Sequence, residues 1–534
     1  MKRFKFTKKF ISLVFVALMT VATLIGSTLG LSACKEESQD GREMNKTFFN
    51  PIRIDSMLGD PFIYRHTDGY YYYMHSQGTG VTVTRSKWMT QVVPKAGDTT
   101  GTKKIFHQSD IGVSMIWAPE MFFIDGYWYC YFTATVGTTD NEIHANRRIY
   151  VMKSKTADAM GDWNEAKKMD LPADSWAIDA TYMTYKGKHY LLWSGWPVAL
   201  TSGFDWEQRI YITRLADDDP MKAYSTDPSA RIQISLPKYR KWESTGSWMN
   251  EGPAVVYAPN GRPFVFYSTC SSTSDFYTMA YCTLLGNNEE EWENNILNPV
   301  TDSDGSSVGW RKESEPFFEP DIAMNELIAP GHNSFTKSPD GTEDWICYHV
   351  AKYSGAGWDR LTRLQKLSWD ENNFPKLEYI PHFSEEIALP SGEQVNRVVY
   401  EAEDAILTKG CQVIKSSDFH ADGTTVLNFA SNGKAVRPAA KDDTVTFEFE
   451  VPENGEYLLS VRFANTSVNE EEIVMTVNGD SYTLFAPKTG SDSCYITTPQ
   501  YVELFVKPDF KNKVVISSGA SFLIDCLVVD YLDR

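Results

Sequence analysis

The chain has 534 residues, which is long enough for more than one domain. Its formal net charge is −19 at pH 7, and this acidic balance disfavours nucleic acid and anionic lipid as partners and suits a neutral substrate. Aromatic residues make up 13% of the chain, but because flat rings both stack on sugars and fill β cores, composition alone does not choose a function.

Residues 1–33 are predicted to be a targeting segment rather than part of a folded domain. A basic start precedes an apolar stretch from Phe10 to Leu24, as in a signal peptide. The sequence Leu31-Ser32-Ala33-Cys34 then resembles a bacterial lipobox, which implies that Cys34 is lipidated. An ordinary secretory signal with a chance cysteine and an uncleaved anchor are the alternatives. We expect residues 34–49 to be a flexible tether, and the protein to be secreted and held outside a bacterial membrane only by that lipid.

One short phrase occurs five times between residues 50 and 385. Each copy has a titratable residue, an apolar stretch, a turn with Gly or Pro-Asp-Gly and a run of aromatics, which together predict a β-hairpin. The copies open at Asp60, Glu120, Asp179, Glu251 and His332. The openings lie 60, 59, 72 and 81 residues apart. Repeats of this length, with several strands each, predict a β-propeller with one blade per repeat, five in all. Because the innermost strands of a propeller line one channel, the five opening side chains are predicted to gather at one end of it.

The sequence changes character after Trp369, the last tryptophan. Residues 386–397 are polar and contain Pro-Ser-Gly, which predicts a linker. Residues 398–534 contain short alternating strands separated by Gly, Asn and Pro, as in a β-sandwich of the jelly-roll type. The sequence therefore predicts an all-β protein, with a propeller over 50–385 followed by a sandwich.

The eight cysteines show no CxxC pair and no Cys/His metal spacing. Cys130 and Cys347 lie in apolar strand runs and are predicted to be buried thiols. A disulfide between Cys270 and Cys282 is left open by the sequence.

A cluster of carboxylates favours glycoside hydrolysis, which commonly needs one carboxyl group as acid and another as base or nucleophile. The acid must keep its proton at the working pH, and burial or a neighbouring carboxylate raises its pKa enough. An Asp-Pro or a Glu-Gly-Pro by itself is a turn opening. Five copies in register argue for chemistry, because aiming carboxylates at one another brings no stability. A serine-nucleophile site is not supported, since no GxSxG occurs.

The opening motifs together resemble glycoside hydrolase family 43, whose members are five-bladed propeller enzymes that invert the anomeric centre. The motifs are Asp60-Pro61-Phe62-Ile63, Trp117-Ala118-Pro119-Glu120, Ile178-Asp179-Ala180-Thr181, Asn250-Glu251-Gly252-Pro253 and Gly331-His332-Asn333-Ser334. The resemblance covers about residues 50–385. It implies that Asp60 is the general base, that Glu251 is the general acid, and that Asp179 orients the acid and tunes its pKa.

The same resemblance implies residues that bind substrate or metal. Arg363 resembles an arginine that hydrogen-bonds sugar hydroxyls, whereas Arg360 is taken as a surface residue. His332 matches the family's central histidine, which often helps to bind a metal ion or water, so a calcium ion in the channel is an expectation. Glu120 is predicted only as a pocket residue. Tryptophans beside the motifs are candidate sugar platforms or blade packing, namely Trp117, Trp193, Trp196 and Trp248.

The C-terminal domain resembles carbohydrate-binding modules of families 6 and 35. It begins Tyr400-Glu401-Ala402-Glu403 and carries Ile524-Asp525 near its end. The resemblance implies that Glu401, Glu403 and Asp525 hold a structural calcium, an ion that hard oxygen ligands suit. Such modules usually expose a tryptophan toward the sugar, and this domain has none. A tyrosine would have to substitute, with Tyr482, Tyr495 and Tyr501 as candidates. No organic cofactor is expected.

The longer phrases IWAPEMFFIDGYWYCYFTA and WMNEGPAV look most like family members that act on α-L-arabinofuranosides. The sequence therefore predicts an inverting, exo-acting hydrolase that releases terminal α-L-arabinofuranosyl residues from plant pentose polysaccharides or oligosaccharides. A β-D-xylosidase is the alternative, because it shares the fold and the catalytic trio. A surface lipoprotein that binds sugar without catalysis is a further alternative, against which the intact trio argues.

Overall fold

The computed structural model describes residues 46–54, 59–95, 97–98, 100–198, 207–237, 241–299, 309–321, 327–381, 385–415, 430–492 and 494–531. The predicted signal peptide, Cys34 and most of the predicted tether lie outside these ranges. The described part is an all-β protein, with two short α-helices, α2 (Asp140–Ala145) and α3 (Glu289–Asn295). Among the described residues, no helix is long and apolar enough to cross a membrane.

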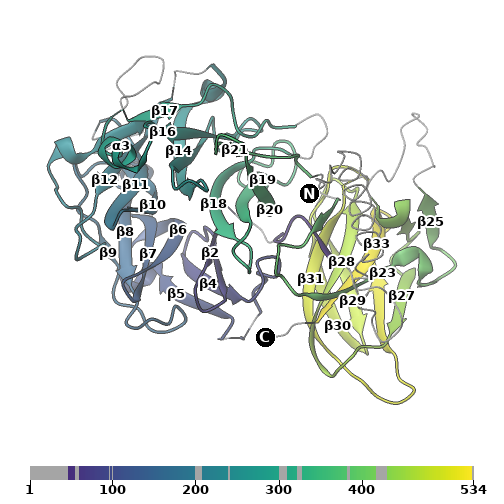
Figure 1. Ribbon diagram of the computed structural model, residues 1–534. Helices are drawn as coiled ribbons and strands as arrows, with labels where there is room; N and C mark the ends of the chain where they lie inside the picture. Colours follow the sequence, from purple (N-terminus) through teal and green to yellow (C-terminus); the bar gives the residue numbers. More distant parts are fainter. Residues whose placement is uncertain are drawn as a thin grey trace, which may run out of the picture.

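Strands of the first part follow one another in groups of four, and within each group they pair antiparallel in chain order (Figure 1). The groups are β2 (Phe62–Arg65), β3 (Tyr71–Met74), β4 (Gly80–Ser86) and β5 (Thr102–His107); β6 (Ser114–Ile124), β7 (Tyr127–Thr135), β8 (Arg148–Lys153) and β9 (Lys167–Lys168); β10 (Ala177–Tyr185), β11 (Lys188–Gly195), β12 (Glu207–Arg214) and β13 (Ile232–Ser235); β14 (Trp248–Tyr257), β15 (Pro263–Thr269), β16 (Thr278–Leu284) and β17 (Trp310–Lys312); and β18 (Gly331–Lys337), β19 (Asp344–Ala351), β20 (Arg360–Trp369) and β21 (Pro375–Lys376). A short parallel pairing of β12 with β14 joins the third and fourth groups.

The first strand of each group lies beside the first strand of the next. β2 contacts β6, β6 contacts β10, β10 contacts β14, β14 contacts β18, and β18 contacts β2. The predicted hairpin turns connect these strands to their partners. Asp125 and Gly126, for example, both have positive φ between β6 and β7, as a tight two-residue hairpin requires.

Every first strand has a residue with positive φ at or near its beginning, and β6 has a second one, Met115 (53°). The corresponding residues of the five strands are Asp60 (58°), Ala118 (42°), Asp179 (57°), Gly252 (57°) and His332 (40°). In β6, β10, β14 and β18 the pairing register shifts at this point, so a β-bulge re-aims the side chains that follow. These five positions are therefore structurally equivalent. In the second and fourth copies of the repeat they are Ala118 and Gly252, whereas the titratable openings there are Glu120 and Glu251.

Two antiparallel sheets of the second part share one core, as the alternating pattern predicts. One sheet holds β23 (Asn396–Glu401), β25 (Gln412–Lys415), β26 (Lys434–Arg437), β28 (Gly455–Asn465), β31 (Ile496–Leu504) and β33 (Phe522–Tyr531), and the other holds β24 (Ile406–Leu407), β27 (Thr444–Phe449), β29 (Glu471–Val477), β30 (Asp480–Ala486) and β32 (Asn512–Ser517). Phe447, Leu459, Ile473 and Ile516 are buried between them.

The two parts are joined by more than the connecting chain. β1 (Thr47–Phe49), at the end of the predicted tether, pairs with β22 (Glu386–Ala388), at the start of the predicted linker. Arg397 donates to the Thr47 carbonyl oxygen at 2.5 Å and forms a two-point ion pair with Asp530. The Arg462 guanidinium lies 4.1 Å from the ring centre of Phe49. The strand before the first part is thus anchored on the second.

All of the described cysteines are free thiols. Cys130 and Cys347 are fully buried in strands β7 and β19, which confirms that prediction. Cys270 and Cys282 are buried and unbridged, so the disulfide left open by the sequence does not form.

Candidate active site

Three predicted site residues from different strand groups meet around one imidazole. The Nδ1 atom of His332 lies 3.1 Å from an oxygen of Asp60 and 3.9 Å from an oxygen of Asp179. Glu251 joins the cluster beside Asp179. The backbone nitrogen of the next residue, Gly252, donates to Asp179 at 3.0 Å, and the charges of Asp179 and His332 act on the Glu251 carboxyl group. Gly252 has left-handed backbone, and a Cβ there would lie 3.0 Å from the His332 ring, so the position favours glycine. The structure thus brings Asp60, Asp179, Glu251 and His332 together.

Asp60 is held as an ionised carboxylate. Ser76 donates to its Oδ2 at 2.5 Å, and the Arg360 guanidinium lies 3.5 Å from its Oδ1. Burial alone would raise the pKa of Asp60, but the charge and hydrogen bond of His332 and the charge of Arg360 outweigh burial and lower the pKa. A general base has to be ionised to take up a proton, and Asp60 meets that requirement.

Glu251 has the opposite protonation state. Its side chain is buried, and the Tyr277 hydroxyl donates to its Oε1 at 2.9 Å. Burial first, and the negative charge of Asp179 second, raise the pKa of Glu251 to about 8. Glu251 therefore keeps its proton at neutral pH while Asp60 does not, and such a divergence between two carboxyl groups marks an acid and a base.

Asp179 and His332 titrate on either side of neutrality. Burial raises the pKa of Asp179 to about 6, partly offset by the charge of His332. Burial would lower the pKa of His332, but Asp60 and Asp179 raise it to about 9. At neutral pH an imidazolium therefore lies between two carboxylates, and it neutralises part of their repulsion.

The metal ion expected at His332 stays a prediction. The Nδ1 atom of His332 is engaged with Asp60 at 3.1 Å, and a histidine that ligates a metal through its other ring nitrogen commonly makes such a contact with a carboxylate. Within the described ranges, no group of three or more His, Cys, Asp or Glu side chains is arranged to hold a metal ion.

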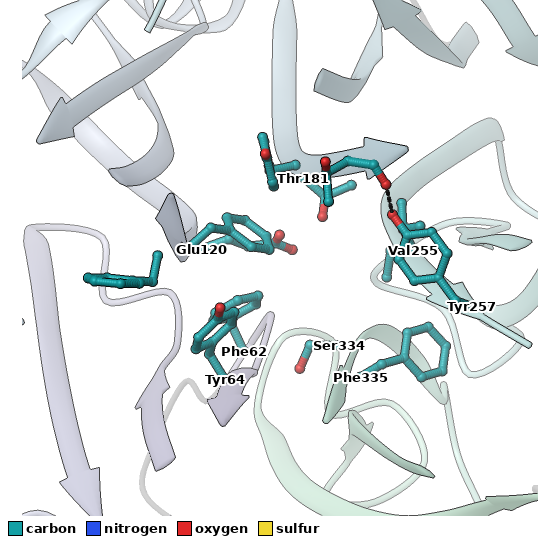
Figure 2. Close-up of a pocket in the computed structure, with 13 residues that line it drawn as sticks. Phe62, Tyr64, Glu120, Thr181, Val255, Tyr257, Ser334 and Phe335 are labelled. Carbon is teal, nitrogen blue, oxygen red and sulfur yellow. Dashed lines mark hydrogen bonds between the residues drawn. The ribbon is translucent and has the colours of Figure 1, made fainter. Parts of the chain in front are cut away.

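Glu120 lies deeper along the strands than the cluster around His332. It follows the positive-φ residue Ala118 by two positions, as Phe62 follows Asp60 and Thr181 follows Asp179. Burial raises the pKa of Glu120 to about 8. Figure 2 shows its carboxyl group directed into a cavity beside Phe62 and Thr181. The repeat pattern aligned Glu120 with Asp60, and the bulge in β6 is the reason that alignment does not hold in space.

The site arginine is Arg360 rather than Arg363. Arg360 is buried, lies beside Asp60 and donates to the Ser272 carbonyl oxygen at 2.7 Å. Arg363 instead donates to the Pro381 carbonyl oxygen and packs over the Tyr348 ring. Strand β20 pairs regularly over these residues, so two positions three apart face opposite sides. The prediction of Arg363 as a sugar-binding residue is therefore corrected.

The predicted tryptophans divide between the site and the core. Trp117 is half-buried, with the Arg147 guanidinium 4.0 Å from its ring centre, and the charge of Asp179 acts on that arginine. Trp248 begins β14, three residues before Glu251, and is 46% exposed. Trp193 is only 1% exposed and packs in a core cluster, so it offers no face to a sugar, and its prediction as a platform is corrected.

Sequence reasoning missed several residues of the cluster. Tyr277 holds Glu251, Ser76 links Asp60 to the backbone nitrogen of Ala118, and His349 accepts from the Asp60 backbone at 3.2 Å. Tyr277 and His349 stack with ring planes 8° apart. None lies in the opening motif of a repeat, so the pattern gave no signal for them.

The predicted calcium ligands of the second part meet only in part. Ser431 links two of them, donating from its hydroxyl to Glu401 at 2.7 Å and from its backbone to Asp525 at 2.7 Å. Asp525, however, is fully buried in an ion pair with Arg462, which supplies its counter-charge. Glu401 and Glu403 each bury one carboxyl oxygen that lacks a hydrogen-bond partner among the described residues. Glu401 and Glu403 thus keep an oxygen each that suits a cation, although Lys434 lies 3.4 Å from the other oxygen of Glu403.

Comparison with known proteins identifies relatives of the first part. The family model for glycosyl hydrolases family 43 matches residues 48–375. An extracellular exo-α-(1→5)-L-arabinofuranosidase of Streptomyces avermitilis is 32% identical over 338 residues, which are 62% of this chain and 63% of the relative. α-L-Arabinofuranosidase 43 of Humicola insolens is 29% identical over 325 residues, 59% of this chain and 60% of the relative. The chain thus spans less than two thirds of either relative's length.

A solved structure agrees with these matches. The α-L-arabinofuranosidase of Lactobacillus brevis superposes with a TM-score of 0.51 at 28% identity, covering 65% of this chain and 99% of that one.

Proposed function

The chain belongs to glycosyl hydrolases family 43, and from this premise we propose that it is an inverting, exo-acting glycosidase that releases terminal α-L-arabinofuranosyl residues. The observation that carries the proposal is that two carboxyl groups of one cluster differ in protonation state: Asp60 is ionised and Glu251 is protonated. The choice of arabinofuranoside rests on the names of the relatives above.

In the proposed mechanism the two carboxyl groups act on opposite sides of the scissile bond. Glu251 gives its proton to the leaving oxygen, and Asp60 takes a proton from the water that attacks the anomeric carbon, which inverts its configuration. Asp179 fixes the strand of the acid through the Gly252 backbone and raises the pKa of Glu251 through its charge. Arg360 and His332 keep Asp60 ionised.

The family also implies how the five groups of strands are arranged. We infer a closed five-bladed propeller, with one group of four strands per blade. The side-by-side order of β2, β6, β10, β14 and β18, and the contact of the last with the first, support this arrangement. The second part is proposed to be a carbohydrate-binding-like module. Calcium held there by Glu401 and Glu403 remains part of the proposal.

The proposed setting is outside the cell, on plant-derived polysaccharides or oligosaccharides. The relative from Streptomyces avermitilis is named as an extracellular enzyme, which supports secretion. Anchoring through a lipid on Cys34 stays a proposal based on the sequence motif.

A panel of nitrophenyl pentosides tests the function. We expect release from the α-L-arabinofuranoside and little from the β-D-xyloside, and L-arabinose as the product from arabinan. Release from the xyloside alone would overturn the substrate, and no release from any glycoside would favour a sugar-binding protein. Following the anomer first formed by NMR tests inversion.

A further inference from the structure

A cavity lies further along the five first strands than the catalytic cluster. It has a volume of about 310 Å³, within the range of small-molecule sites. All five first strands contribute to its wall, through Phe62 and Tyr64, Glu120 and Phe122, Thr181 and Tyr182, Val255 and Tyr257, and Ser334 and Phe335. Asp60, Asp179, Glu251 and His332 do not line it, because the lining residues follow them along each strand. The cavity is therefore lined by other residues than the site of hydrolysis, although the charges of His332 and Asp179 act on Glu120.

Aromatic rings form most of this wall (Figure 2). The ring centre of Phe122 lies 5.3 Å from that of Phe62 and 5.4 Å from that of Tyr182. Across the cavity, Figure 2 shows Tyr257 and Phe335. The Tyr257 hydroxyl donates to the Thr184 carbonyl oxygen at 2.5 Å, which fixes that ring at the rim. The electron-rich faces of such rings attract a cation and give little to an anion.

Glu120 is the single carboxylic acid among the thirteen residues drawn around the cavity, and none of them is Lys, Arg or His. It is only 5% exposed, and its Oε2 atom has no hydrogen-bond partner among the described residues. Figure 2 shows this carboxyl group directed toward the open space. Because buried polar groups in folded proteins are normally paired, an unpaired oxygen aimed into a cavity points to a ligand that pairs with it. Burial raises the pKa of this carboxyl group to about 8, and a cation bound beside it would lower that pKa and favour the ionised form.

We propose that this cavity binds a small organic cation of the alkylammonium class, with its charged head against the aromatic faces and beside the carboxyl group of Glu120. A bound anion would meet a carboxyl group and no basic side chain. Hydroxyl groups of Thr181, Thr184 and Ser334 also belong to the lining residues, so a neutral sugar is the competing ligand that the experiment has to separate from a cation. The formal charge of −19 also favours cations around the protein.

Calorimetric titration with choline chloride tests the proposal, with sodium chloride at equal concentration as the control for ionic strength. The neutral analogue 3,3-dimethylbutan-1-ol has the same shape without the charge. We expect saturable binding of choline to the full chain and at least tenfold weaker binding of the analogue. Excess L-arabinose should not displace choline, because the cavity is lined by other residues than the site of hydrolysis.

Variants locate the binding. We expect Glu120→Gln to weaken choline binding at least tenfold and Tyr257→Leu at least fivefold. Tyr127→Leu, which removes an exposed ring from β7 outside the cavity, is the matched control and should bind as the parent does. Val255→Lys puts a tethered ammonium into the cavity and should abolish binding, and it keeps the test decisive if Glu120→Gln does not fold.

Absence of saturable choline binding, equal binding of the neutral analogue, displacement by L-arabinose, or unchanged affinity in the folded variants would each overturn the proposal. None of these results depends on hydrolysis, so the test is independent of the function proposed above.

Discussion

At the scale of single residues, Glu251 and Asp60 have different roles in the reaction. One substitution at each residue distinguishes these roles. Replacing Glu251 by Gln removes the proton donor, and we expect kcat on an arabino-oligosaccharide to fall roughly 10²–10⁴-fold. The loss should be smaller on a nitrophenyl arabinoside, whose leaving group needs little protonation. Asp60→Asn should lose activity on both substrates, because the water still needs a base. Equal losses for Glu251→Gln on both substrates would contradict its role as the acid.

The pH dependence of hydrolysis follows from the same residues. Activity requires Glu251 to be protonated, so kcat/KM is expected to fall as the pH rises through about 8. It requires Asp179 to be ionised, so kcat/KM should also fall as the pH drops through about 6. Asp179→Asn removes a negative charge that raises the pKa of Glu251, and the alkaline limb should therefore move to lower pH. An unmoved alkaline limb in that variant would remove Asp179 from this role.

The two arginines of β20 offer a matched comparison. Arg360→Met takes a positive charge from beside Asp60, and we expect kcat/KM to fall at least tenfold. Arg363→Met leaves the Pro381 carbonyl oxygen without this donor in the core, so it should lower the melting temperature more than it lowers kcat/KM. Activity measurements and thermal melts on both variants check this, and the reverse pattern would restore the assignment made from the sequence.

At the scale of strands and turns, a buried ion pair supports the strand that carries the acid. Lys312 of β17 lies 2.6 Å from Glu243 of η3 (Lys241–Ser244), and both side chains are fully buried. Lys312 also donates to the side-chain oxygen of Asn250, next to Glu251, at 2.9 Å. Tyr267 donates to Glu243 at 2.7 Å. The network therefore ties three separate elements to the residue that precedes the acid.

Breaking this pair should be costly. Lys312→Met leaves Glu243 without its buried counter-charge, and we expect a loss of about 3–5 kcal/mol in the free energy of unfolding. The double variant Lys312→Met with Glu243→Leu should recover part of the loss, because neither charge is then buried alone. Chemical denaturation of the single and double variants checks this, and equal stability of the two would contradict it.

Strand starts were predictable from the sequence, but the way each strand begins was not. The hairpin phrase with its Gly turn found all five first strands, and the register of Asp60, Asp179 and His332 gave most of the cluster. A bulge adds residues on one strand without a mark in the sequence, so Glu120 was aligned with Asp60 although it lies two positions deeper. The side of the sheet on which Arg360 lies depends on where β20 begins. Tyr277 lies 26 residues from Glu251 in the chain and reaches it only through the packing of the strands.

At the scale of the whole molecule, the two parts are expected to unfold together. One hydrophobic cluster contains Ile346 and Tyr348 of the first part as well as Tyr400 and Phe447 of the second. Tyr501 donates across the junction to the Val93 carbonyl oxygen at 2.6 Å. Scanning calorimetry should show one transition, and a chain ending at residue 385 should melt at lower temperature because Phe49 and its surroundings lose their cover. Two well-separated transitions of the full chain would contradict this coupling.

The five positive-φ residues suggest where the protein can be stabilised by substitution. Holding a side chain in left-handed backbone costs about 1–3 kcal/mol, and at Asp60, Asp179 and His332 that expense is tied to groups the reaction needs. Ala118 has the same backbone but only a methyl group, so glycine there would relax the fold without altering any reacting atom. Among the five positions, heat tolerance can thus be raised at Ala118 without replacing a group that the reaction needs.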